Sequence, residues 1–180
     1  PCYKVNNHIM DLLPKIPKNI VKIYCIDDAC PNHSGKLIES KNKDNRVKVL
    51  YHQKNQGVGK AVKTGYLEAK KDGCDIAVKI DGDAQMDPRL IPSFIHPIEK
   101  EQCDYTKGNR FFSLDSISEM PRHRLFGNAI LSFITKLSSG YWNIFDPTNG
   151  YTAIHLSLIN LIDIDKIADR YFFESDLLFR

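Results

Sequence analysis

The sequence lacks several features that mark particular classes of protein. No apolar stretch is long enough to cross a membrane. The net charge is only +3, and no run of lysine and arginine is interleaved with aromatic residues, which argues against a nucleic-acid partner. The six histidines and five cysteines have no paired metal-ligand spacing, and we expect the cysteines to be reduced thiols in a cytoplasmic environment. The cysteines are Cys2, Cys25, Cys30, Cys74 and Cys103.

The remaining composition is that of an ordinary globular protein. Its 180 residues are 42% hydrophobic and 26% charged, which is enough chain for one domain with a buried core. The chain opens on Pro1 with no strand before it and stops at Arg180 inside an apparent helix. We therefore expect a single domain that is trimmed at both ends.

The most informative stretch is an apolar, β-branched run at residues 75–80 that ends in an acidic turn. It predicts a buried strand with Asp81 and Asp83 at its carboxyl end, where ligands bind in open α/β sheets. Gly82 lets the backbone bend between the two carboxylates. Such a pair suits Mg²⁺ or Mn²⁺ carrying a phosphate group. The competing interpretation of an isolated Asp-x-Asp is a solvated acidic turn.

Strand-like and helix-like segments alternate through the first part of the chain. This order predicts a mainly parallel α/β sheet with right-handed crossovers. An earlier strand also ends in carboxylates, Asp27 and Asp28. The expected strands are residues 21–26, 47–52, 75–80 and 104–109, and the expected helices are residues 4–13, 36–41, 61–71, 88–100 and 122–137.

The run from Gly57 to Lys60 is glycine-rich and precedes a helical pattern. It does not match a P-loop, because Ala61 stands where that motif needs Ser or Thr. Two interpretations stay open. The run is either a flexible helix entry or a helix N-terminus close to a phosphate or a sugar.

The last third of the chain combines polar turns with aromatic segments. Residues 156–169 are apolar-periodic, and residues 171–180 set Glu174 and Asp176 among aromatic side chains. The structural alternative for these two acids is a pair at a helix N-terminus. The basic and apolar start of the helix expected at 122–137 suggests contact with a membrane surface, although packing of that helix on its own domain is commoner.

Taken in order, four of these segments resemble the inverting family 2 glycosyltransferases, which have the GT-A fold. The resemblance covers nearly the whole chain and implies a Rossmann-like three-layer α/β sandwich with a mostly parallel central sheet, in which residues 1–180 form one catalytic domain. The second half looks most like the polyprenyl- and dolichol-phosphate mannose synthases. The matching segments are 1–3, 26–28, 55–57 and 81–88, followed by 127–128, 139–140 and 146–151.

The resemblance also implies roles for individual residues. Asp83 would bind the metal ion, and Asp81 the ribose or the metal. Glu174 is the preferred base, with Asp176 as second choice, and Asp28 is the candidate for contact with the nucleotide base. The other expected donor-binding residues are Pro1, Tyr3, Asn55, Lys60 and Gln85, and the expected acceptor- or phosphate-binding residues are Arg110, Arg122, Arg124 and Asn149.

The sequence departs from the family pattern at three places. Lys4 and Val5 stand where Asn-Glu is usual, and Ala29-Cys30 replaces Gly-Ser. Thr152 replaces an arginine that contacts phosphate in the family, so that contact is not carried over.

The implied function is metal-dependent, inverting transfer of a sugar from a UDP- or GDP-sugar. The acceptor would be a polyprenyl phosphate or a glycan in the synthesis of cell-envelope polysaccharides or glycoconjugates, with Mg²⁺ or Mn²⁺ as cofactor. The expected location is the cytoplasmic face of a membrane, with peripheral contact. Two alternatives stay open, namely a haloacid-dehalogenase-like phosphatase, which also has Asp-x-Asp after an apolar strand, and a non-catalytic module that binds nucleotide sugars.

Overall fold

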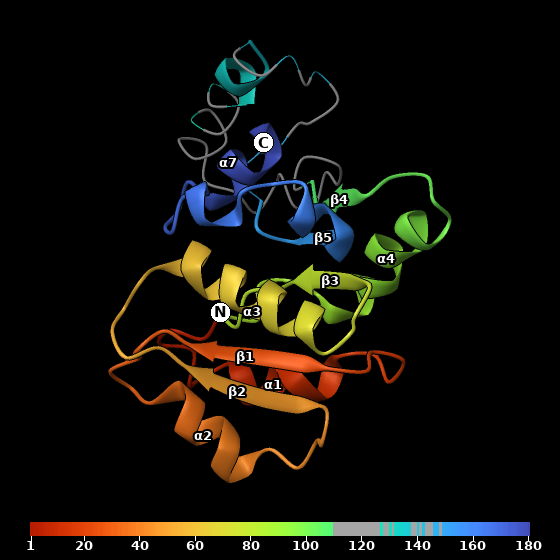
Figure 1. Cartoon of the computed structure of the whole chain (residues 1–180). Coiled ribbons are helices and arrows are strands. Elements are labelled where there is room, and N and C mark those ends of the chain that lie inside the picture. Colours follow the sequence, from red (N-terminus) through yellow and green to blue (C-terminus); the bar gives the residue numbers. More distant parts are fainter. Residues whose placement is uncertain are drawn as a thin grey trace.

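A computed structural model describes residues 1–109, 127, 130, 132–137, 140, 142, 146–147 and 149–180. Two hydrogen-bonded groups of strands, with helices packed around them, make up its body (Figure 1). Arg110, Arg122 and Arg124, which the sequence predicted to bind the acceptor or a phosphate, lie outside the described residues.

The first group is a parallel pair of strands. β1 (Ile23–Asp27) pairs with β2 (Val47–Tyr51), and α2 (Ser34–Lys41) lies between them in the chain. On the opposite edge of β1, Cys2 forms an isolated parallel bridge with Asp27. The opening residues therefore lie beside the carboxyl end of β1, as the resemblance of residues 1–3 to the tail of a first strand implied.

The second group has three antiparallel strands in the order β3 (Ile76–Lys79), β5 (Thr152–His155) and β4 (Tyr105–Lys107). In Figure 1, β1, β2 and β3 point the same way, as the alternation predicted, but of the described strands only β1 and β2 pair in parallel, and β3 is hydrogen-bonded to antiparallel β5. β5 was not predicted, because four residues after a polar turn give too little period-two pattern. A cavity of about 440 Å³, lined by side chains of β1, α3 and β3, separates the two groups of strands.

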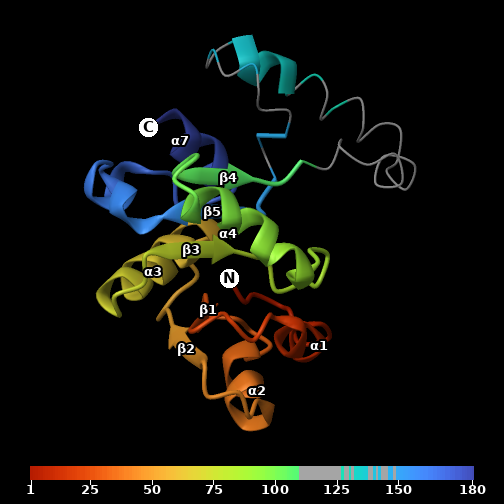
Figure 2. The same ribbon diagram turned by 90° about the vertical axis from the view of Figure 1, so that its right-hand side faces the viewer.

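Helices cover the strands on two sides (Figure 2). α3 (Val58–Lys71) lies on one side, and α1 (Ile9–Leu12) and α4 (Ile91–Glu99) lie on the other. Two buried clusters fill the spaces between these layers. Neighbouring residues of β5 divide between them, Ala153 with the α1 and α4 side and Ile154 with the α3 side, since successive side chains of a strand point to opposite faces.

Several helices are shorter than the helical patterns of the sequence predicted. The 3-10 helices η1 (Leu13–Lys15) and η2 (Pro88–Leu90) follow α1 and precede α4. The apolar period of residues 156–169 corresponds to two further 3-10 helices, η3 (Leu156–Asn160) and η4 (Ile164–Lys166), rather than to one continuous helix. α7 (Phe173–Phe179) closes the chain. Within the ranges given above, no helix is long and apolar enough to span a membrane.

Candidate active site

The ends of β3, β4 and β5 meet at one edge of the three-stranded group. Lys79, the last residue of β3, stands opposite Thr152 of β5, which in turn stands opposite Lys107 of β4. The Asp81–Asp83 turn follows directly. A Cβ on Gly82 would lie only 3.1 Å from the carbonyl oxygen of Pro1, so the turn packs against the opening residues of the chain.

Three charged side chains converge beside this turn. The ammonium of Lys79 lies 2.8 Å from Oδ1 of Asp81 and 3.0 Å from Oε1 of Glu174 in α7. Lys79 is 5% exposed and Glu174 is 7% exposed, whereas Asp81 is half-buried. The structure thus brings together Asp81 and Glu174, which the sequence predicted as donor-binding residue and base. The lysine between them was not predicted.

Gly150 makes this convergence sterically possible. A Cβ at this position would overlap the Nζ atom of Lys79 and would lie 3.0 Å from Oδ2 of Asp81 and 3.4 Å from Oε1 of Glu174. The polar turn that contains Gly150 therefore packs directly on the three charged groups, and a side chain at this position would force Lys79 to move.

Asp83 stays open to solvent beside this group. Its side chain is partly exposed, and its Oδ1 accepts a hydrogen bond of 3.1 Å from the backbone N–H of Gln85. The described part of the chain holds no cluster of three or more His, Cys, Asp or Glu side chains arranged for a metal ion. One or two carboxylates completed by substrate phosphates and water are the usual protein share of a Mg²⁺ site. Asp83, with Asp81, fits that pattern.

Asp28 lies at the end of β1, but protein groups already surround its carboxylate. Its Oδ1 accepts from the N–H of Gln56 at 2.9 Å, and its Oδ2 accepts from the N–H of Gly57 at 2.8 Å. Nδ1 of His52 lies 2.6 Å from Oδ1, and the Asn55 amide donates to the Asp28 carbonyl at 3.3 Å. Asp28 therefore fixes the segment that contains Asn55, and its direct contact with a nucleotide base stays a prediction.

The entry to α3 is closely packed rather than open. The N–H of Lys60 donates to the carbonyl of Asp169 at 3.0 Å. A Cβ on Gly57 would lie 2.5 Å from that carbonyl, and one on Gly59 would lie 2.5 Å from the Ala168 carbonyl. The glycines thus let residues 168–170 approach the helix, and this approach leads into α7 and Glu174. The geometry favours a structural role for this run over phosphate binding at the helix N-terminus.

Asp176 and Asn149 are both engaged within the fold. Asp176 accepts from the N–H of Ala168 at 2.8 Å and from Arg180 at 3.0 Å, so it fixes the start of α7 instead of facing Asp81. The Asn149 side chain accepts from the N–H of Tyr151 at 2.9 Å, and its carbonyl accepts from Lys107. Of the two acids in α7, Glu174 is the one that faces the site.

Two tyrosine hydroxyls are buried close to Glu174. Burial raises the pKa of Tyr66 and of Tyr105 well above the ordinary value, and the negative charge of Glu174 adds to the shift in both. Both hydroxyls therefore stay protonated at neutral pH, and neither supplies a negative charge to the site.

Comparison with known proteins gives this arrangement a family context. Residues 5–162 match Glycosyl transferase family 2. Over 126 residues the chain is 36% identical to UDP-N-acetylglucosamine–dolichyl-phosphate N-acetylglucosaminyltransferase of Methanococcus voltae, covering 70% of this chain and 50% of that protein. Over 160 residues it is 26% identical to undecaprenyl-phosphate mannosyltransferase of Micrococcus luteus, covering 88% and 65%.

A solved structure supports the fold. Glucosyl-3-phosphoglycerate synthase of Mycobacterium tuberculosis, in complex with Mn²⁺, UDP and glucosyl-3-phosphoglycerate, has a TM-score of 0.73 at 16% identity, covering 99% of this chain and 61% of that one. The fold is the GT-A α/β fold that the sequence predicted. The chain spans about half to two thirds of the length of the proteins it matches.

Proposed function

From the premise that this chain belongs to glycosyl transferase family 2, we propose that it carries the site of an inverting sugar transfer from a nucleoside diphosphate sugar to a polyprenyl phosphate. The observation that carries the proposal is the meeting of the Asp81–Asp83 turn with Glu174, a residue 95 positions beyond Lys79 in the chain. The acids proposed to bind the donor, Asp81 and Asp83, and the acid proposed to act at the reacting carbon, Glu174, thus lie at the carboxyl end of one strand, where α/β folds bind ligands.

The transfer is a single displacement at the anomeric carbon of the donor sugar. An oxygen of the acceptor phosphate forms a bond to that carbon while the bond to the diphosphate breaks, and the nucleoside diphosphate leaves with the electron pair. A phosphate acceptor is already anionic, so no proton has to be removed from it. Glu174 then holds a negative charge beside the carbon where positive charge develops.

Asp83 and Asp81 are the residues that would hold a divalent ion, Mg²⁺ or Mn²⁺. When bound, such an ion neutralises charge on the leaving diphosphate as a Lewis acid. The nucleotide itself, UDP or GDP, would lie against the opening residues and the turn. Two observations support this proposal: Pro1 closely approaches Gly82, and the side chain of Tyr3 is exposed.

The choice of acceptor rests on the relatives. The names of the Methanococcus and Micrococcus proteins each include a polyprenyl-type phosphate. A glycan acceptor is the second candidate, and Glu174 would then remove the proton of the attacking hydroxyl. The haloacid-dehalogenase-like phosphatase and the non-catalytic module are not favoured, because the family match covers most of the chain.

Binding of the nucleotide with its metal ion is the direct test. Mn²⁺ together with UDP or GDP is expected to raise the melting temperature, and Asp83→Ala is expected to abolish the increase. Ligand at one hundred times its Kd adds about 2.7 kcal/mol of stability, and each kcal/mol is about 2–4 °C for a domain of this size.

Asp87→Asn is the matched control, since Asp87 is a carboxylate of the same loop that pairs with Arg89. It should keep the full response. An unchanged melting temperature with every nucleoside diphosphate, in the wild-type protein, would count against the proposed function.

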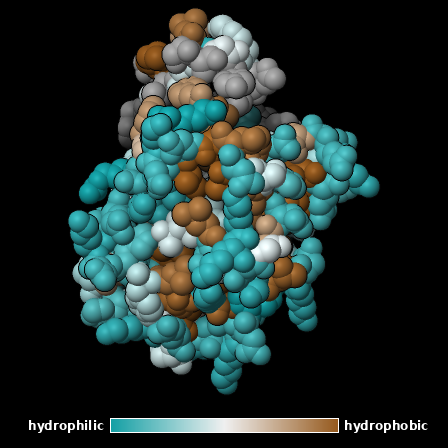
Figure 3. Space-filling model, in the orientation of Figure 1, coloured by the Kyte–Doolittle hydropathy of each residue, from teal (hydrophilic) through white to brown (hydrophobic). Residues whose placement is uncertain are grey.

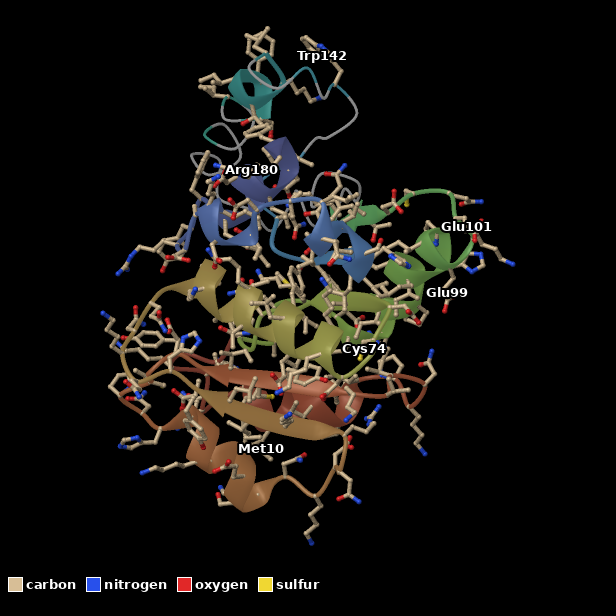
Figure 4. All side chains as sticks on the ribbon, viewed as in Figure 1. Met10, Cys74, Glu99, Glu101, Trp142 and Arg180 are labelled. Carbon is tan, nitrogen blue, oxygen red and sulfur yellow. The ribbon has the colours of Figure 1, made fainter. Side chains whose placement is uncertain are left out.

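A membrane contact follows from the proposed acceptor, which is a lipid. The helical residues at 132–137 expose Phe133, Ile134 and Leu137 by 56%, 55% and 60%. Figure 3 shows hydrophobic atoms at this end of the molecule, and Figure 4 shows Trp142 there, at the opposite end from Met10. We propose that this end rests on the cytoplasmic face of a membrane.

Sedimentation with liposomes checks this placement. The wild-type protein is expected to sediment with liposomes that contain anionic lipid, and the triple variant Phe133→Ser, Ile134→Ser, Leu137→Ser is expected to stay in the supernatant. Sedimentation of both proteins alike would exclude this surface, and concentration-dependent dimers of the wild type without liposome binding would assign the surface to a second copy of the chain.

A further inference from the structure

Lys79 stands in an unusual place for a lysine. It ends the apolar strand β3 and is 5% exposed, although a buried ammonium is costly unless it is paired and hydrogen-bonded. Its ammonium forms ion pairs with two acids of the candidate site, at 2.8 Å from Asp81 and 3.0 Å from Glu174. The ammonium of Lys79 therefore links Asp81, at the start of the Asp81–Asp83 turn, to Glu174 in the first turn of α7.

We propose that Lys79 is a positioning residue that holds Glu174 at the donor site and prevents the Asp81–Glu174 pair from binding a divalent ion of its own. This inference rests on the proposed function for the role of Glu174. The ammonium stands between the two carboxylates and satisfies one oxygen of each. The second oxygen of Asp81 and the partly exposed Asp83 are thereby left for the metal ion of the substrate complex.

The charge argument starts from the two acids without the lysine. Each lies within 3.0 Å of the same nitrogen atom, so their carboxylates are close neighbours. Two such carboxylates repel each other unless a cation lies between them. Hard divalent ions bind carboxylate oxygens at 2.0 to 2.6 Å, so the two oxygens, now 2.8 and 3.0 Å from the nitrogen, would have to move closer to bind an ion in its place. An ammonium fills the same position with three N–H donors and a single charge.

A second buried lysine supplies a matched control. Lys63 of α3 is 2% exposed, donates to the Ile167 carbonyl at 2.6 Å and pairs with Asp169 at 2.6 Å. It is as buried as Lys79 and also binds the segment before α7, but neither Asp81 nor Glu174 is among these partners. Lys63→Met therefore reports the general cost of removing a buried ammonium from this part of the fold.

The experiment compares Lys79→Met, Lys79→Arg and Lys63→Met with the wild type in two measurements. The first is the change in melting temperature with Mn²⁺ alone, without any nucleotide. Lys79→Met is expected to gain stability from Mn²⁺ where the wild type and Lys63→Met do not. The gain should disappear in the double variant Lys79→Met, Glu174→Gln, because the second carboxylate is then neutral.

The second measurement is the steady-state kinetics of transfer. Lys79→Met is expected to lower kcat roughly 10- to 100-fold, as the loss of an outer residue that orients a functional group does. The KM for the donor sugar should change less, and Lys79→Arg should recover part of kcat. Should Lys79→Met fail to fold, Lys79→Arg and Lys79→Gln carry both measurements.

The outcomes separate this inference from the proposed function. Equal Mn²⁺ responses in Lys79→Met and the wild type, together with a kcat within twofold, would overturn the role of Lys79. A wild-type protein that neither binds nucleoside diphosphate nor transfers sugar would overturn the proposed function, whereas the measurement with Mn²⁺ alone would still decide whether Lys79 shields the two acids.

Discussion

Replacing Glu174 with glutamine is expected to lower the rate of sugar transfer roughly 100- to 1,000-fold, the range seen when one preorganised charge-stabilising group is removed. Glutamine keeps the size of the side chain and can still face Lys79, so the change removes charge more than shape. Glu174 is 7% exposed and hydrogen-bonded to a buried lysine, which fixes its carboxylate before substrate arrives. Preorganised charge of this kind acts on the reacting carbon without reorganisation during the reaction.

Binding of the nucleotide separates the role of Glu174 from that of the metal-binding turn. The variant Glu174→Gln should keep the increase in melting temperature with Mn²⁺ and UDP or GDP, because the metal and the diphosphate are assigned to Asp83 and Asp81. Rapid-quench measurement of the transfer step on saturated enzyme gives the rate without contribution from product release.

Asp176→Asn is the control for Glu174→Gln. Asp176 holds the N–H of Ala168 and Arg180, so its loss should lower the stability of the protein more than the rate of transfer. The reverse pattern, with transfer lost in Asp176→Asn and kept in Glu174→Gln, would transfer the role of base or charge-stabilising acid to Asp176.

Much of the fold can be predicted from local sequence patterns. The elements that were not predicted have a common cause. The strands that precede acidic turns are recognisable because apolar, β-branched runs end abruptly at carboxylates. β5 is not recognisable, since its four residues gain their identity from pairing with β3 on one side and β4 on the other. Such pairing joins residues far apart in sequence, and no short window contains it.

The site divides in the same way. Asp81, Asp83 and Glu174 stand out locally as acids beside apolar or aromatic runs. Lys79 looks like an ordinary lysine at a strand end, and its importance appears only when α7 delivers Glu174 from 95 residues away. For Asp28 the sequence misleads in the other direction. Its motif suggests an acid open to ligands, but the residue is only 3% exposed, because groups of residues 52–57 surround its carboxylate.

Gly150→Ala is the variant with the second large expected effect, because it adds one methyl group where three charged side chains meet. The new Cβ would overlap Nζ of Lys79 and approach Asp81 and Glu174 to 3.0 and 3.4 Å. The φ angle of Gly150 is not positive, so the backbone tolerates alanine. We therefore attribute the expected loss of stability and activity to the collision with the side chains. We expect a loss of about 1–3 kcal/mol of stability from overpacking and a roughly 100-fold loss of transfer from displaced groups.

Gly65→Ala is the control. Gly65 lies inside α3, where an added Cβ would stand 3.8 Å from Ile26 of β1, so alanine should stabilise the helix by about 0.5–1 kcal/mol.

A double-mutant cycle then locates the collision. Because Lys79→Met removes the ammonium that the new methyl group meets, the two changes should be non-additive in the free energy of unfolding, with the cost of Gly150→Ala smaller in the Lys79→Met background. Additive losses in the free energy of unfolding would show that the new methyl group does not collide with Lys79, and that the Gly150 turn is not energetically coupled to the three charged side chains.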